Sequence, residues 1–299
     1  MKRAIPAVIA AAAVGLSGCY MFQAPPPKFD PSIAPASQAA TFINMTEAKR
    51  KGEINKIAFT SCNVMIGQVV SASARTDAGA FGQTRGRVDA KVTKLYYLRG
   101  MTDEQQQALA EDLCKQAEAA YKGAGYEVLG ASELAGNEFY VKMHEGGKPS
   151  PFEFKQGPAT YKIFAPKGQT ITNVAYVGAG KALAMAFSQA SGNNPMFHEG
   201  RLIDQLKADT AQIEIFVDFA QISADGAGKG SFTARKDTAS VKGSVGMTVT
   251  SKVLFTPSEG IKCWVRFGKN ECLPNYRGPV LAMKHPMTDN GEFNADTKD

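Results

Sequence analysis

Two His-Glu pairs are the residues of this chain that could most readily bind a metal or transfer a proton. His144 is followed by Glu145, and His198 is followed by Glu199. Imidazole and carboxylate groups act as zinc ligands and general bases, but neither pair has the i, i+4 spacing that puts two ligands on one helical face. The two pairs could meet in the fold and form a site. We expect instead that they are solvated loop residues, like the third histidine, His285, and we predict no metal site.

Two other segments suggest catalysis or nucleotide binding only in part. Ser61 and Cys62 offer adjacent nucleophiles, but no base stands near them in the sequence, and a nucleophile needs an oriented partner. Residues 178–181 (Gly-Ala-Gly-Lys) resemble the end of a phosphate-binding loop. A Walker A loop needs glycine and Ser or Thr where this chain has Ala175 and Ala182. We therefore expect no catalytic residue and no cofactor, and the chain is predicted not to be an enzyme.

The amino terminus has the features of a secretory signal. Two basic residues at positions 2 and 3 precede an apolar run from Ala4 to Leu16. This run is shorter than the roughly 20 residues that a helix needs to cross a membrane, and its length is typical of a signal peptide. It ends in Leu16-Ser17-Gly18-Cys19, which resembles the lipobox of bacterial lipoproteins. The resemblance implies cleavage before Cys19 and acylation of that cysteine; an ordinary cleaved signal that leaves a free thiol is the alternative.

This resemblance also implies where the protein is located and how the chain is divided. Several acyl chains on one residue would anchor it stably, whereas a single chain binds only marginally. By the sorting rule of such lipoproteins, a residue other than aspartate after the cysteine implies the outer membrane, facing the periplasm. The predicted parts are a signal peptide at 1–18, a lipid anchor and Pro-rich linker at 19–45, a periplasmic domain at 46–284 with a subdivision near 195 left open, and a polar tail at 285–299.

The remaining four cysteines fit an oxidising compartment. Four cysteines permit two disulfides in three connectivities. We favour Cys263–Cys272, because residues 262–272 read as a hairpin that turns at 268–270, and opposed hairpin positions reach disulfide distance. Cys62 and Cys114 would then pair or remain buried thiols. A zinc site is the alternative, but no CxxC spacing supports it.

Composition and charge limit the kinds of partner that we expect for this chain. The chain has 299 residues, of which 44% are hydrophobic and 21% charged, as in ordinary globular proteins. Its formal net charge of +6 is mild and scattered, and no basic-aromatic motif accompanies it, so we do not expect nucleic acid as a partner. No apolar run after the signal is long enough to predict a membrane-spanning helix.

Periodicity predicts an α+β domain. A capping box at Thr102 opens an amphipathic helix that ends at Gly123. Apolar residues in β-like alternation predict strands on both sides of it. The predicted strands cover 56–70, 88–97, 126–129, 171–177, 211–220, 241–255 and 261–267, with short helices at 179–190 and 200–207. We expect a mainly antiparallel sheet with helices packed on one face.

This order of elements is similar to the α/β domain of the curli-secretion (CsgG-like) lipoproteins and the related TolB amino-terminal-like domains. The similar parts are the strand at 56–70, the helix that ends in Ala124-Gly125-Tyr126 and the strands of 211–267. The resemblance implies an envelope protein that acts through protein contacts, in some cases as an oligomeric secretion pore. No matching constriction loop is present, and 138–194 has no counterpart.

The sequence therefore predicts a lipid-anchored, non-catalytic envelope protein that acts as a scaffold or assembly partner at the outer membrane. Its expected partners are the membrane, through the lipid, and other envelope proteins. Two alternatives remain open: a subunit of a CsgG-like oligomeric secretion channel, which would make it a homo-oligomer, and a periplasmic lipoprotein that binds or hydrolyses a small molecule.

Overall fold

A computed structural model describes the fold for eleven stretches of the chain. They are residues 30, 32–46, 55–75, 91–156, 159–172, 195–225, 240–266, 268–275, 278–284, 287–289 and 297–298. The signal peptide with Cys19, the segment 178–181, the helix expected at 179–190 and His285 lie outside these residues.

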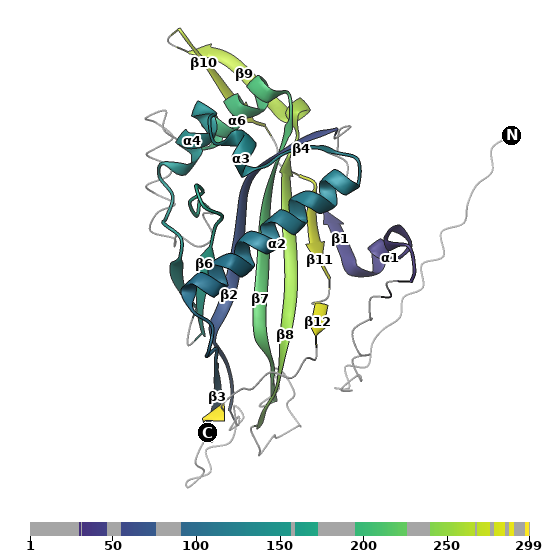
Figure 1. Cartoon of the computed structure of the whole chain (residues 1–299), viewed down its shortest axis with the longest axis vertical. Coiled ribbons are helices and arrows are strands. Elements are labelled where there is room, and N and C mark those ends of the chain that lie inside the picture. Colours follow the sequence, from purple (N-terminus) through teal and green to yellow (C-terminus); the bar gives the residue numbers. More distant parts are fainter. Residues whose placement is uncertain are drawn as a thin grey trace, which may run out of the picture.

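A mixed sheet of 11 strands forms the body (Figure 1). Its three long central strands are β2 (Lys56–Arg75), β7 (Asp209–Asp225) and β8 (Ser240–Thr256). β7 and β8 pair antiparallel as a long hairpin, whereas β2 runs parallel to β7. Only β2–β7 and β2–β4 are parallel among the described pairs of strands. The other strands of this sheet are β1 (Ile43–Thr46), β3 (Lys91–Tyr97), β4 (Glu127–Leu129), β5 (Phe152–Gln156), β6 (Ala159–Phe164), β11 (Val280–Met283), β12 (Met287–Asp289) and β13 (Thr297–Lys298). A separate two-stranded sheet consists of β9 (Ile261–Arg266) and β10 (Lys269–Pro274).

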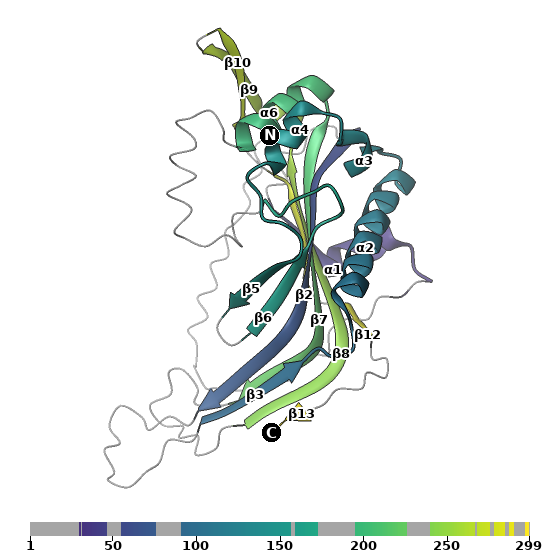
Figure 2. The ribbon, with the colours of Figure 1, turned by 60° about the vertical axis from the view of Figure 1, so that its left-hand side comes forward.

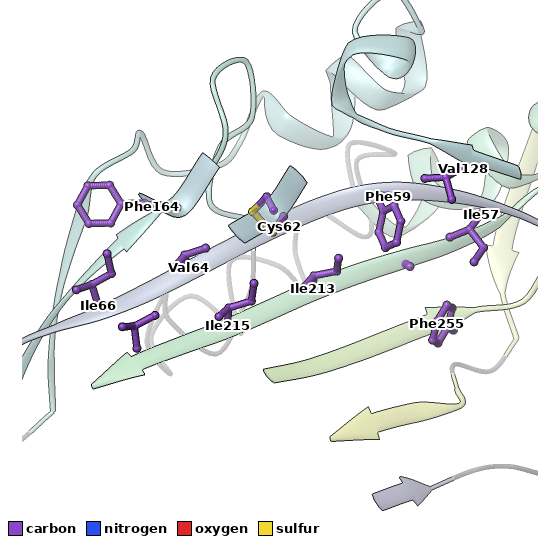
Figure 3. Packing of buried hydrophobic residues seen from close by; sticks show 14 residues of the cluster. Ile57, Phe59, Cys62, Val64, Ile66, Val128, Phe164, Ile213, Ile215 and Phe255 are labelled. Atoms are coloured by element: carbon purple, nitrogen blue, oxygen red, sulfur yellow. A yellow bond between two sulfur atoms is a disulfide. The ribbon is translucent and has the colours of Figure 1, made fainter. Parts of the chain in front are cut away.

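One long helix, α2 (Asp103–Gly123), covers the main core. The side chain of Thr102 accepts a hydrogen bond from the amide of Gln105, and Gln105 Oε1 accepts one from the amide of Thr102, so the predicted capping box is confirmed. Ala110 and Cys114 on its buried face pack against alternate residues of the central strands. Figure 3 shows these strand residues, among them Phe59 and Ile213, aligned on the same side of β2 and β7.

A second helical group packs near the end of the sheet where β2 begins. It consists of α3 (Ala131–Leu134), α4 (Glu138–His144) and α6 (Pro195–Leu206). Leu134, Tyr140 and Leu202 pack around Ala58, which alternates along β2 with the residues that contact α2. The predicted α+β class is confirmed. The expectation that the helices pack on one face is wrong for this smaller group, because Ala58 faces the side of β2 opposite to the residues that contact α2.

Both disulfide pairs form in the structure. Cys62 on β2 bonds to Cys114 on α2, and Cys263 on β9 bonds to Cys272, the residue directly opposite on β10. The structure thus supports disulfide bonding, including the pair Cys62–Cys114, which the sequence left undecided. β9 pairs only with β10, in a separate two-stranded sheet, and not with the main sheet as the sequence suggested.

The chain ends of the domain carry more structure than expected. Residues predicted as an extended linker form α1 (Pro35–Phe42) and β1, and β1 pairs with β11. In the predicted loose tail, β12 pairs with β8 and β13 pairs with β3. Composition alone misses these elements because their stability comes from backbone pairing with distant strands rather than from a local apolar pattern. Among the described residues, no helix has the length and apolar character needed to cross a membrane.

Candidate functional site

An interruption along one edge of β2 brings several buried polar side chains together. On this edge β4 pairs with Lys56–Ala58 and β6 pairs with residues 64–69, while β7 occupies the opposite edge. Among the described strands, none pairs with residues 59–63 on this side. We call this interval the β2 gap. Buried backbone groups left without a ladder need other partners, and side chains supply them here.

His144 and Gln169 close the β2 gap. His144 Nε2 lies 3.0 Å from the carbonyl oxygen of Thr60. The amide of Cys62 donates to Gln169 Oε1 at 3.1 Å, and Gln169 Nε2 donates to the hydroxyl of Tyr140 at 2.8 Å. Burial raises the pKa of Tyr140 to about 12, so this phenol stays protonated. These side chains replace a missing strand.

The contacts of His144 fix its neutral form. The amide of Thr170 donates to Nδ1 at 3.1 Å, so Nδ1 is an acceptor, and Nε2 must carry the proton that the Thr60 carbonyl accepts. Burial lowers the pKa of this imidazole, which agrees with a neutral ring. A general base would accept a proton at Nδ1, but the lone pair of this atom already accepts the hydrogen bond from the amide of Thr170. The expectation of a solvated loop residue is wrong for His144, because the β2 gap draws it into the core.

Glu199 is the centre of a second buried cluster. Its side chain is 1% exposed, and Oε1 accepts hydrogen bonds from the hydroxyls of Thr210 at 2.7 Å and Thr256 at 3.1 Å. These threonines lie opposite each other on β7 and β8. Glu199 thus attaches α6 to the central hairpin. A carboxylate held by hydroxyl donors in this way acts as a structural acceptor.

His144 lies on α4 and His198 on the neighbouring helix α6, but the two His-Glu pairs do not form one site. His198 is 4% exposed on α6, so it too is a buried residue and not the solvated one expected. Burial lowers its pKa, and Arg201 and Lys142 add to the effect. His144 points into the β2 gap, whereas Glu199 contacts β7 and β8. Within the described residues, the one His, Cys, Asp and Glu group close enough to hold an ion is Asp204 with Cys263 and Cys272, and the sulfurs of both cysteines are in a disulfide.

Cys62 is not a free nucleophile. Its sulfur is bonded to that of Cys114, and both residues are nearly fully buried. Its neighbour Ser61 is 5% exposed on β2. The segment that suggested a nucleophile therefore serves to attach α2 to the sheet.

The sheet carries further polar groups that the sequence analysis did not identify. Asn63 is 2% exposed, and its amide has no hydrogen-bond partner among the described residues. Its register partner on β7 is Glu214, which lies 3.8 Å from Lys252 on β8; burial raises the pKa of Glu214. The strand alternation of 211–220 indicated only that Glu214 lies on the face opposite the apolar one.

Asp218 shows how closely β7 approaches β2 on this face. A Cβ at Gly67 would lie 2.8 Å from Asp218 Oδ1, so only glycine leaves room for the carboxylate. Burial also raises the pKa of Asp218. Asn63, Glu214 and Asp218 form a polar strip along β2 and β7 that could donate to or accept from a polar group. No described hydrogen bond joins any of these three residues to a histidine.

The geometry defines a class of fold: an α+β domain with a large, mostly antiparallel sheet, one long covering helix and two disulfides. No protein-family model, no curated protein and no solved structure matches the chain.

Proposed function

We propose that this chain is a lipid-anchored protein of the bacterial cell envelope that acts without catalysis, as a scaffold or assembly partner. In this proposal Cys19 is acylated and tethers the domain to the outer membrane, facing the periplasm. The two disulfides suit an oxidising compartment. The buried His144 and Glu199 hold the fold together, which supports a role in binding over one in chemistry.

The observation that carries the proposal is a ribbon of strands beyond the helix layer. It consists of the far ends of two hairpins, 69–75 with β3 and 219–225 with 240–246 of β8. Figures 1 and 2 show that these strand ends continue past α2. Tyr96 and Phe219 pack together there and give the ribbon a small core of its own. No described helix covers these strand ends, and apart from the part of β3 that pairs with β13, their outer edges could pair with another protein.

The same ribbon favours a second candidate, a subunit of an oligomeric secretion channel. Two hairpins that project from each subunit could assemble side by side in a ring. Extraction in mild detergent followed by size determination separates the candidates. A ring of many copies supports the channel, and a monomer supports the scaffold. Cross-linking in intact envelopes before a pull-down would identify the scaffold's partners.

Acylation is tested by labelling cells with palmitate. We expect the label in the wild-type chain and none in Cys19→Ser, which should also fail to be processed and should fractionate differently. The Cys62→Ala/Cys114→Ala variant is a matched control, because it removes cysteines but leaves the lipobox intact. If the wild type takes up no label, or if Cys19→Ser matures and fractionates like the wild type, the anchoring proposal is wrong.

A further inference from the structure

The β9–β10 hairpin is a rigid projection at one end of the molecule. In both views it extends beyond α6, and the ribbon of strands lies at the opposite end of the long axis (Figures 1 and 2). The disulfide between Cys263 and Cys272 joins its two strands. A Cβ at Gly200 of α6 would overlap the backbone of Cys272, so the hairpin is seated directly against this helix. Its shape is therefore fixed before it meets any partner.

Two large apolar side chains of this hairpin face solvent. Val265 is 71% exposed and Trp264 is 39% exposed. Trp264 packs only partly on the fold, with its ring centroid 6.4 Å from that of Phe197. They lie near the turn at Gly268, so a flat surface that meets the hairpin end-on would contact them together. The two side chains point to opposite faces of β9, and together they give the end of the hairpin apolar area on both sides.

The charged residues of the hairpin sequence indicate which kind of surface the hairpin would contact. The hairpin sequence 261–274 contains three basic residues, Lys262, Arg266 and Lys269, and a single acidic one, Glu271. Lys262 is exposed, whereas Glu271 is half-buried. The nearest carboxylate of α6, Asp204, is paired with Lys207 at 2.6 Å and does not offset this charge. A basic sequence that carries an exposed tryptophan and an exposed aliphatic side chain matches the interface of a bilayer with anionic headgroups.

We propose that the β9–β10 hairpin is a membrane-contact element that inserts Trp264 and Val265 into the headgroup region of a bilayer containing anionic lipids. The disulfide and the contact with α6 pre-organise the hairpin, so insertion orders little additional chain. The contact would direct the ribbon away from the same bilayer and toward partners in the aqueous space. The inference goes beyond the proposed function, and it concerns the hairpin whether or not Cys19 is acylated.

Trp264 is the only tryptophan of the chain, so its fluorescence reports on the hairpin alone. The experiment uses the full-length chain with Cys19→Ser, which excludes acyl chains, and vesicles of phosphatidylcholine with or without phosphatidylglycerol. We expect the anionic vesicles to shift the emission to shorter wavelength, and brominated lipids in them to quench it. Each basic residue near an anionic surface increases the affinity about fivefold. The three basic residues of the hairpin sequence should therefore make its affinity for anionic vesicles roughly 100-fold higher than for neutral vesicles at low salt.

Two variants at exposed positions test the two parts of the argument. Lys262→Glu should weaken the anionic preference about 25-fold, because it removes one positive charge and adds a negative one, and each unit of charge is worth about fivefold. Val265→Asp should reduce quenching at least about tenfold, because a charge replaces the inserted side chain. Lys115→Glu, the same charge change at an exposed site on α2, is the matched control and should behave as the parent chain does. Peptide mapping without reductant, which detects the Cys263–Cys272 bond, shows that each variant hairpin has formed.

Trp264 emission that neither shifts nor is quenched by anionic vesicles would overturn the proposal. So would equal responses of Lys262→Glu, Val265→Asp and Lys115→Glu. A shift produced by lipid-free envelope proteins, with no response to vesicles, would identify a protein partner instead and would also refute the lipid contact. Because palmitate labelling tests Cys19 separately, the failure of either idea leaves the other intact.

Discussion

The two disulfides should differ in how much they stabilise the fold. Cys62–Cys114 joins residues 52 apart, whereas Cys263–Cys272 joins residues 9 apart. If a disulfide acts by restricting the unfolded chain, the longer loop contributes about 4 kcal/mol and the shorter one about 2.5 kcal/mol. The longer one also connects the central strand β2 to the helix α2, both in the main core, so its loss should weaken the whole domain.

The test compares the double variants Cys62→Ala/Cys114→Ala and Cys263→Ala/Cys272→Ala by urea unfolding followed with circular dichroism. We expect the first to lose the larger part of the free energy of unfolding. The second should lose less in the global transition while Trp264 fluorescence reports loosening of the hairpin. Wild-type protein treated with reductant under the same conditions should lose at least as much as the first variant, which controls for the packing change at alanine. Equal losses in the two variants, or a larger loss in the second, would refute the loop-length argument.

Two further predictions concern the buried polar residues. Burial lowers the pKa of His144, so its neutral form is favoured by folding; the stability it confers is complete above the unfolded value of about 6.5 and is lost as the pH falls below it. The His144→Gln variant lacks this titration, so its free energy of unfolding should fall less steeply between pH 7 and 5, by up to about 1.4 kcal/mol per pH unit. Urea titrations at several pH values measure this dependence. The same dependence on pH in the variant and the wild type would contradict the role given to His144. Glu199→Ala should cost about 3 kcal/mol, because Thr210 and Thr256 lose their acceptor, whereas Glu199→Gln keeps an acceptor oxygen and should cost less. If both variants unfold at the same urea concentration as the wild type, the carboxylate does not hold α6 to the sheet.

Local patterns in the sequence were sufficient for the main elements. The Thr102 capping box marks the start of α2 because its hydrogen bonds join residues three apart. The alternation in 211–220 and 241–255 predicts β7 and β8, because one face of each strand packs against the core. The hairpin that pairs Cys263 with Cys272 is also local, since the two residues are close in the sequence and opposite in register.

Only the tertiary structure decided the roles of His144, Gln169 and Glu199. No local signal shows that β4 and β6 leave a gap along β2, because each pairs with β2 over a large sequence distance. The gap draws His144 and Gln169 into the core, where unpaired backbone groups would otherwise be costly. The sequence by itself thus determined the main elements, which depend on neighbouring residues. The fold determined which polar residues are structural, because that depends on strands that are distant in the chain.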